Sequence, residues 1–300
     1  MSNHNFNIYF EKFPLWKGVA SRSRAPEFYP FSLGWHELGF LYQNTPKAII
    51  DRIIQSYSLD EYQFITSPPG SSSWGNARAQ DTIKFILEAF GSPKGASILE
   101  IGAGTTFIAE KLVDEYGAAS YTVMDPTISE TSSYPSIKIV KDYFKLETCP
   151  QEAFDLVLSV STLEHVEDPV IFLKNVQKVL SRKNGKAILI FPDCEKQLFS
   201  GDFNVLLHEH ISYFTKSSFS NVARLCNLEI ISYKSMYDGL YCMLQSSREA
   251  ADNAVKQPLI ADGNINRYNA AFQESIDYLK TLLNQFIEAN QKVAFHGACN

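Results

Sequence analysis

The sequence lacks a surplus of basic residues, a long apolar run and an apolar leader. Its formal net charge is -6, from 27 lysines and arginines against 33 aspartates and glutamates, whereas proteins that bind nucleic acid need cations to neutralise phosphates. No apolar run approaches the ~20 residues of a membrane-spanning helix, and no basic stretch precedes an apolar one at the N-terminus. We therefore expect neither nucleic acid nor membrane as a partner, and a cytoplasmic protein.

Cysteine is sparse and shows no pairing pattern. The chain has five cysteines in 300 residues, and none belongs to a C-x-x-C pair. They are Cys149, Cys194, Cys226, Cys242 and Cys299. This spacing indicates neither a zinc knuckle nor a disulfide framework, so reduced thiols packed in the interior are expected. With 45% hydrophobic residues the chain can bury a large core, in one domain with additions or in two.

The rest of the chain is organised around the stretch 96–110. A short apolar run from Ile98 to Ile101 predicts a buried strand, and Gly102-Ala103-Gly104 then predicts a turn before a helix that begins near Phe107. Glycine lets a ligand lie close to the backbone, and the free N–H groups at the start of a helix point towards it. We expect a ligand-binding turn, and the alternative is a turn that only joins a core strand to a helix.

The residues around this turn disfavour a dinucleotide. The dinucleotide fingerprint needs a third glycine three positions after Gly104, where this chain has Phe107. Glu100, directly before the turn region, would repel a phosphate and suits a cation, such as the ammonium and sulfonium of S-adenosylmethionine. A nicotinamide-dependent oxidoreductase is the weaker alternative.

Further strands and helices alternate as in a doubly wound parallel sheet. Strands are expected at 121–125, 137–140, 154–159 and 187–191, with a closing hairpin over 228–233 and 239–245. Because an acid at the end of the second strand can accept both ribose hydroxyls, Asp125 is a candidate cofactor ligand, or else a turn aspartate before Pro126. Asp142 and Tyr143 could hold an adenine, and Ser159 ends the fourth strand on the ligand side.

In the N-terminal part, residues 1–90, the sequence predicts an irregular aromatic-rich lid over 1–45, a helix near 46–57 and a second helix that buries Ile83 to Phe90 and ends at Gly91. Tyr62 and Trp74 border a loop rich in serine, proline and glycine that either roofs the ligand or is a flexible linker. Residues 194–203 are expected to be an irregular insertion.

The polar cluster His208-Glu209-His210 is the segment most suited to acid–base chemistry. A histidine titrates near neutral pH, and a neighbouring carboxylate orients its ring. In an extended segment His208 and His210 would share one face and could bind a metal ion, but no third ligand has diagnostic spacing, so no metal site is predicted. A structural pair of histidines is a further alternative. His165, after the fourth strand, could touch the substrate or order its loop.

A long amphipathic helix is expected over 264–290, and 292–300 predicts the start of another strand and turn. We expect the helix to pack on the rest of the chain. Residues 247–300 would then be a helical extension and the beginning of a further domain that is cut short.

The stretch from Glu100 to Gly104 resembles motif I of the class I S-adenosylmethionine-dependent methyltransferases. The chain from about Tyr62 onward, with His210 in a Glu-His segment after the fifth strand, resembles the C-methyltransferases that act on keto-deoxysugar nucleotides. That resemblance implies that His210 removes a proton beside a ketone, with Glu209 as its neighbour and Tyr213 nearby. Leu207 stands where the family has a tyrosine, and the N-terminal zinc module of the family is absent.

These features together predict an α/β protein with a Rossmann-like doubly wound methyltransferase sheet over 91–246. The expected function is methyl transfer from S-adenosylmethionine to a small polar metabolite, such as a sugar or sugar nucleotide, by C-methylation. The alternatives are O-methylation of a saccharide hydroxyl and a non-catalytic binding protein with the same fold. The sequence leaves the oligomeric state open.

Overall fold

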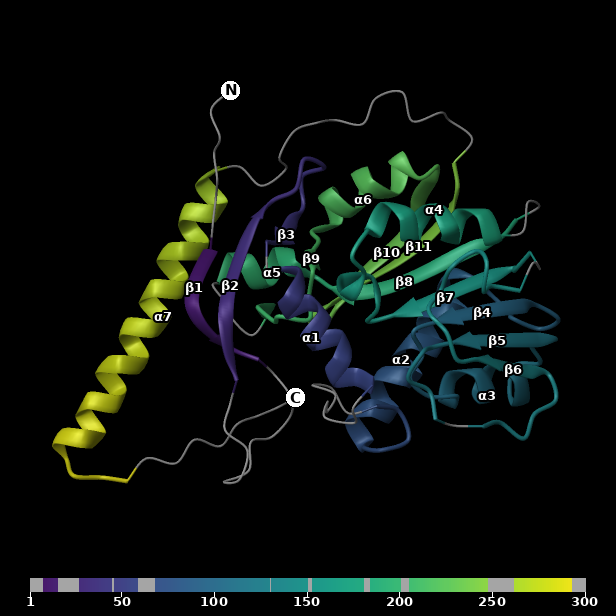
Figure 1. Ribbon diagram of the computed structural model, residues 1–300. Helices are drawn as coiled ribbons and strands as arrows, with labels where there is room; N and C mark the ends of the chain where they lie inside the picture. The colour runs from purple at the N-terminus through teal and green to yellow at the C-terminus, as the bar shows by residue number, and fades with distance from the viewer. Residues whose placement is uncertain are drawn as a thin grey trace.

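The computed structural model is a mixed α/β protein built on a seven-stranded sheet (Figure 1). Its strands lie in the order β10-β11-β8-β7-β4-β5-β6, and a second sheet has the order β1-β2-β3-β9. In the central sheet β4 to β8 are parallel, while β11 pairs antiparallel with both β8 and β10. The doubly wound fold expected from the sequence is confirmed. The structure describes residues 8–15, 27–44, 46–58, 68–129, 131–150, 153–180, 184–200, 205–247 and 262–292.

The elements have the following bounds. The central strands are β4 (Ser97–Ile101), β5 (Ser120–Met124), β6 (Ile137–Val140), β7 (Leu156–Val160), β8 (Lys186–Pro192), β10 (Leu228–Met236) and β11 (Gly239–Ser246). The smaller sheet contains β1 (Ile8–Pro14), β2 (Phe28–Trp35), β3 (Leu41–Gln43) and β9 (Ser212–Tyr213). The helices are α1 (Lys47–Ser58), α2 (Ser73–Ala89), α3 (Phe107–Asp114), the 3-10 turn η1 (Leu163–His165), α4 (Pro169–Val179), α5 (Cys194–Ser200), α6 (Lys216–Leu225) and α7 (Asp262–Glu288).

The two faces of the central sheet carry separate apolar cores, because side chains alternate along each strand. On β4, Leu99 and Ile101 join the core formed with α4 and α6. Ile98 belongs to the core formed with α2 and α3. Both faces are covered, so the parallel strands are nearly all apolar, and sheets of this kind bind their ligands at the carboxyl ends of the strands.

Helix starts follow local signals that the sequence displays. The Ser72 side chain accepts a hydrogen bond from the Gly75 N–H at the start of α2. Asp168, which directly precedes Pro169, accepts one from the Ile171 N–H at the start of α4. Each of these bonds satisfies one backbone donor that the first turn of a helix leaves without a partner.

The N-terminal part differs from the irregular lid expected for residues 1–45. Within the described residues it forms three antiparallel strands, and β3 then pairs with the distant two-residue strand β9. Phe31 and Leu33 alternate along β2 and are fully buried, which anchors this sheet. The alternating pattern of β2 spans few residues, and several side chains that pack in the same core come from distant parts of the chain. Periodicity alone therefore did not predict this strand.

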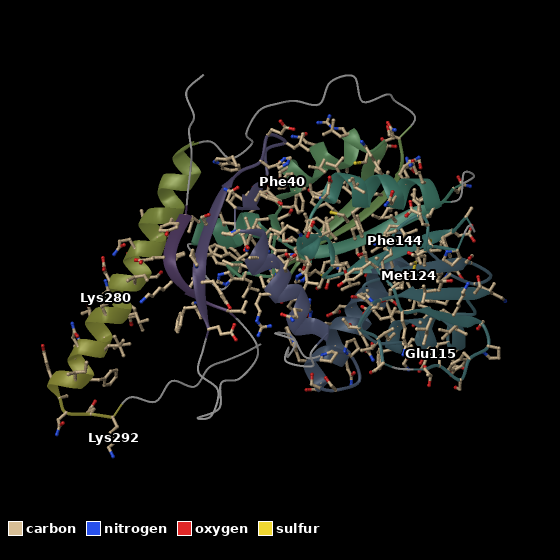
Figure 2. The ribbon with its side chains drawn as sticks, viewed as in Figure 1. Phe40, Glu115, Met124, Phe144, Lys280 and Lys292 are labelled. Atoms are coloured by element: carbon tan, nitrogen blue, oxygen red, sulfur yellow. The ribbon has the colours of Figure 1, made fainter. Side chains whose placement is uncertain are left out.

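Two further segments complete the molecule. Residues 194–200, expected to be irregular, form α5 instead. The expected long helix is α7, which contacts α5 and stands beside β1 in Figure 1. In Figure 2 the side chains of α7, including Lys280, lie at the opposite end of the molecule from Glu115, which caps α3. Residues 293–300, where a last strand was expected, lie outside the described residues. In the described parts, no helix combines the length and apolarity needed to cross a membrane.

Candidate functional site

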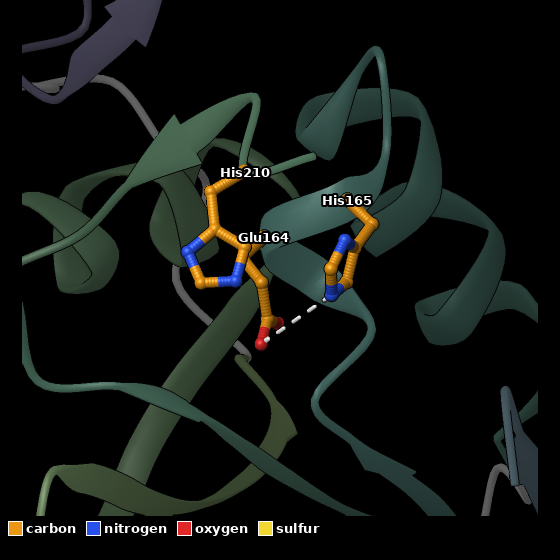
Figure 3. A group of neighbouring side chains, drawn as sticks. All are labelled: Glu164, His165 and His210. Carbon is orange, nitrogen blue, oxygen red and sulfur yellow. Dashed lines mark ion pairs between the residues drawn. The ribbon is translucent and has the colours of Figure 1, made fainter. Parts of the chain in front are cut away.

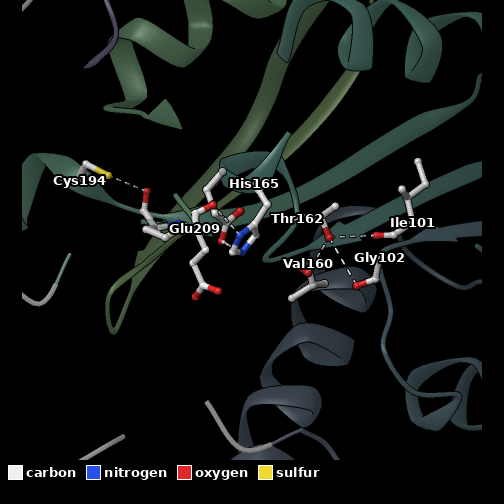
Figure 4. A network of polar contacts seen from close by, with 9 residues as sticks. Ile101, Gly102, Val160, Thr162, His165, Cys194 and Glu209 are labelled. Carbon is white, nitrogen blue, oxygen red and sulfur yellow. Dashed lines mark hydrogen bonds and ion pairs between the residues drawn. The ribbon is translucent and has the colours of Figure 1, made fainter. Parts of the chain in front are cut away.

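The glycine turn after β4 is held in a left-handed conformation. Gly102 and Gly104 have φ angles of +73° and +66°, a region that favours glycine. A Cβ atom added at Gly102 would lie 2.1 Å from Oγ1 of Thr162. The Thr162 hydroxyl reaches the carbonyl oxygens of Ile101, Gly102 and Val160 at 3.2–3.5 Å (Figure 4). The space that the missing side chain leaves is therefore filled by Thr162, which ties the turn to the end of β7.

Asp125 connects this turn to the end of β5. The backbone N–H of Gly104 donates to Oδ2 of Asp125 at 2.9 Å, and both the N–H and the hydroxyl of Thr127 donate to Oδ1 at 2.7 Å. The residue is 6% exposed and lines the cavity described below. A carboxylate oxygen accepts two hydrogen bonds, so Oδ2 can accept one more, from a ligand hydroxyl.

Glu100 lies beneath the turn and not in the cavity wall. Its side chain is 2% exposed and accepts a hydrogen bond of 2.8 Å from the Tyr121 hydroxyl. Burial raises the pKa of Glu100 to about 7, partly offset by that hydrogen bond. The structure thus gives Glu100 a partner in the protein and no direct path to a ligand.

A cavity of about 890 Å³ opens at the carboxyl ends of the parallel strands. Its volume lies in the range of small-molecule sites. Of the residues predicted from the sequence, six line it: Gly102, Asp125, Tyr143, His165, Glu209 and His210. Tyr143 is 51% exposed, which leaves its ring accessible.

Other predicted residues do not line this cavity. Ala103, Gly104, Asp142 and Ser159 lie outside its wall, as do His208, Tyr213 and Trp74. Asp142 accepts the backbone N–H of Tyr143, and the exposed Trp74 packs against Tyr237 with ring centroids 5.6 Å apart. Tyr62 lies outside the described residues.

The segment that carries the histidines is a turn and not an extended strand. The N–H of His210 donates to the carbonyl of Leu207 at 3.0 Å, and the Tyr213 hydroxyl bonds both backbone groups of Leu207. The buried Gln43 donates from Nε2 to the carbonyls of Leu207, His208 and His210 at 3.0–3.1 Å. Gln43 was not among the predicted residues, since it is separated from the turn by more than 160 positions and no local signal marks it.

The turn separates the two histidines that were expected to share a face, so that prediction is wrong. The His208 ring packs among Phe13, Tyr29 and Phe31, at 5.4–6.2 Å between ring centroids, on the side of the smaller sheet. Burial lowers the pKa of His208. Its surroundings are those of a packed core residue.

His210 instead meets Glu164 and His165, which come from η1 (Figure 3). The rings of His165 and His210 are 5.0 Å apart and nearly perpendicular, and Nε2 of His165 is 3.9 Å from Oε1 of Glu164. The Ile211 N–H donates to the carbonyl of Glu164 at 2.7 Å, which fixes the turn against η1. Sequence reasoning did not single out Glu164.

Burial sets the charge state of this group. It raises the pKa of Glu164 and, together with the neighbouring His165, holds the pKa of His210 well below 6.5. His210 is therefore neutral at pH 7. The arrangement places a neutral imidazole, a half-buried imidazole and a buried acid at one end of the cavity, with the glycine turn and Asp125 at the other.

Comparison with known proteins identifies the family of the chain. Residues 73–233 match the family model described as "Methyltransferase domain". No curated protein matches the chain. Several solved structures are similar to it at low identity and with TM-scores below 0.5.

Three of these solved structures are the following. Magnesium protoporphyrin IX methyltransferase from Synechocystis PCC 6803 with bound SAH has 15% identity and a TM-score of 0.48, covering 66% of this chain and 99% of its own. The N-methyltransferase NodS from Bradyrhizobium japonicum has 17% identity and a TM-score of 0.47, covering 64% and 97%. An S-adenosylmethionine-dependent methyltransferase from Mesorhizobium loti has 14% identity and a TM-score of 0.42, covering 51% and 92%. The family match carries the conclusion that follows.

Proposed function

The chain belongs to the methyltransferase domain family and is an S-adenosylmethionine-dependent enzyme, and from this premise we propose that it methylates a small, sugar-like acceptor bound beside His210. The observation that carries the proposal is the shape of the cavity. It extends from the glycine turn and Asp125 to the group Glu164, His165 and His210. A donor at one end and an acceptor at the other would react in line, which is the geometry that methyl transfer needs.

The residues at the donor end fit S-adenosylmethionine. Asp125 lines the cavity with one oxygen still able to accept a hydroxyl, as a ribose would require. Tyr143 also lines the cavity and presents an exposed ring that can stack on an adenine. When bound, the donor supplies an activated methyl group on a sulfonium. Of the other predicted cofactor residues, Gly104 donates a hydrogen bond to Asp125 and Asp142 accepts one from the Tyr143 N–H, both from outside the wall.

The charges of the wall favour an acceptor rich in hydroxyl groups. Its carboxylates are Asp125, Glu164, Glu167, Asp168, Glu209 and Asp238, against the cations Arg78 and Lys145. Carboxylates accept hydrogen bonds from hydroxyls and repel phosphates. We therefore propose a sugar or a similar polyol, and this wall suits a free sugar better than a sugar diphosphate.

We assign the removal of the acceptor's proton to the group of Glu164, His165 and His210. In the form predicted from the sequence, His210 alone takes the proton from a carbon next to a ketone. The lowered pKa of His210 makes a single imidazole a weak base. The three side chains together can remove the acceptor's proton, either from a carbon in C-methylation or from a hydroxyl in O-methylation.

The test uses methyl-labelled S-adenosylmethionine with keto-deoxysugars, free and nucleotide-linked, and with the corresponding alcohols. We expect label in a sugar and loss of transfer in His210→Asn, with donor affinity unchanged in calorimetry. C-methylation further predicts exchange of a sugar C–H with deuterated solvent when the donor is absent, and O-methylation predicts none. Donor binding without transfer to any sugar would overturn the proposed acceptor.

A further inference from the structure

We propose that Glu164, His165 and His210 bind a divalent transition-metal ion at the acceptor end of the cavity. The proposal rests on the proposed function only for the position of the acceptor. It concerns three side chains, of which the sequence singled out His165 and His210, and His210 was considered as a metal ligand only together with His208. Four observations support it: the spacing of the atoms, an unpartnered carboxylate oxygen, the orientation of His165 and the access from the cavity.

The three side chains converge on one point. One oxygen of Glu164 and one ring nitrogen from each histidine all lie within 4.8 Å of one another (Figure 3). Three atoms at that spacing can be no more than about 2.8 Å from a shared centre. Shifts of about 0.7 Å then give the 2.0–2.2 Å bonds that zinc makes with nitrogen and oxygen.

Glu164 has an oxygen without a partner. The residue is 2% exposed, and its Oε2 forms no hydrogen bond within the described part of the chain. A buried carboxylate oxygen with no partner is costly, and a bound cation removes the cost. The same burial raises the pKa of Glu164.

His165 is oriented as a metal ligand would be. Its Nδ1 lies 3.0 Å from the carbonyl oxygen of Glu209. Because a carbonyl only accepts, Nδ1 carries a proton, so the neutral ring has its lone pair on Nε2, which lies 3.9 Å from Oε1 of Glu164. Metal-binding histidines commonly donate the second ring N–H to a carbonyl in this way. The neutral state of His210 leaves a lone pair there as well.

The donor set selects the kind of ion. Two imidazole nitrogens and one carboxylate oxygen suit Zn²⁺, Fe²⁺, Co²⁺ or Mn²⁺, whereas Mg²⁺ and Ca²⁺ prefer oxygen alone. Three protein ligands leave coordination positions open, and all three residues line the cavity. An acceptor oxygen or a water can fill an open position, where the cation lowers its pKa. In this arrangement His210 would be a ligand and not the base, and the oxygen of Glu164 that does not bind the ion would take the acceptor's proton.

The experiment measures binding of Co²⁺ to the full chain after treatment with a chelator. We expect about one Co²⁺ per chain, seen as visible ligand-field absorption that added Zn²⁺ removes. Glu164→Gln and His210→Asn should each weaken Co²⁺ binding by 10-fold or more. His36→Asn is the matched control, because His36 stacks on Phe40 at 4.4 Å and lies outside the cavity wall, and it should bind Co²⁺ as the unaltered chain does.

Binding of S-adenosylhomocysteine, measured on every variant, separates the outcomes. Loss of Co²⁺ with unchanged S-adenosylhomocysteine affinity supports the metal site in a folded chain. Failure of the unaltered chain to bind Co²⁺ while it binds S-adenosylhomocysteine overturns the metal site and leaves the methyl transfer in place. Unchanged Co²⁺ binding in both Glu164→Gln and His210→Asn, or thiolate charge-transfer bands, also overturns it, because the ion would then lie at other residues.

Discussion

Because Gly102 has no side chain, the side chain of Thr162 packs against the glycine turn and connects it to the end of β7. The position requires glycine for two reasons, a φ of +73° and the Thr162 hydroxyl in the space of a Cβ. Gly91 has the first requirement without the second, since its φ is +93° and, among the described residues beyond its chain neighbours, no atom lies within 4 Å of an added Cβ. Replacing each glycine by alanine therefore separates the cost of a left-handed backbone from the cost of a steric clash.

We expect Gly91→Ala to lower the free energy of unfolding by about 1–2 kcal/mol, the cost of a left-handed alanine. Gly102→Ala should lose about 1–3 kcal/mol more, because the methyl group must displace Thr162. Urea unfolding of both variants measures the difference. Adding Thr162→Ala to Gly102→Ala should recover part of the loss, and equal losses in the two single variants would contradict the steric explanation.

At the scale of elements, the turn Leu207–His210 determines which residues face the cavity. It is stabilised from the smaller sheet, where Gln43 ends β3 and donates to three carbonyls of the turn. Strand β3 also pairs with β9, which follows the turn directly. The N-terminal strands thus hold the acceptor end of the cavity in shape, a role that an irregular lid would not fulfil.

Gln43→Leu should lower the free energy of unfolding by about 1–3 kcal/mol, because buried carbonyls lose their donor. Methyl transfer should fall further than stability explains, while affinity for S-adenosylhomocysteine stays unchanged, since the donor end is formed by other elements. Gln245→Leu is the control, because Gln245 bonds Lys186 and Glu229 at the opposite end of the sheet. Equal transfer rates in the two variants would refute the positioning role of Gln43.

At the scale of the whole molecule, the sheet determines where ligands bind. All five parallel strands direct their carboxyl ends to one edge, and the cavity lies there, with the proposed donor end near β4 and β5 and the proposed acceptor end beyond β7. Binding at this edge connects segments from α2 to β11, so a bound donor analogue stabilises the folded chain as a unit.

S-adenosylhomocysteine at 100 times its Kd should raise the free energy of unfolding by about 2.7 kcal/mol. Thermal unfolding with and without the ligand measures this as a shift in Tm. NAD⁺ at equal concentration is the control and should give no shift, because Phe107 stands where a dinucleotide site needs a glycine. A larger shift in Tm with NAD⁺ than with S-adenosylhomocysteine would contradict the assignment of S-adenosylmethionine as the ligand of this cavity and would favour a nicotinamide-dependent oxidoreductase.

The sequence by itself determined the elements that depend on neighbouring residues. Local periodicity and turn chemistry predict the strands before and after Gly102, the cap at Asp168 and the closing hairpin. Each of these is present in the structure. The methyltransferase fold follows from their order. Asp125 and His210 were also placed at the strand ends, where the cavity lies.

Only the tertiary structure decided which of the candidate side chains meet. His208 and His210 are two positions apart but point to different cores, because the turn between them is closed by Gln43. His165 and Glu164 reach His210 from another element, across 45 positions. Local patterns report on the next few residues, whereas a group of this kind depends on how distant segments pack, and that information is not contained in any one stretch of the chain.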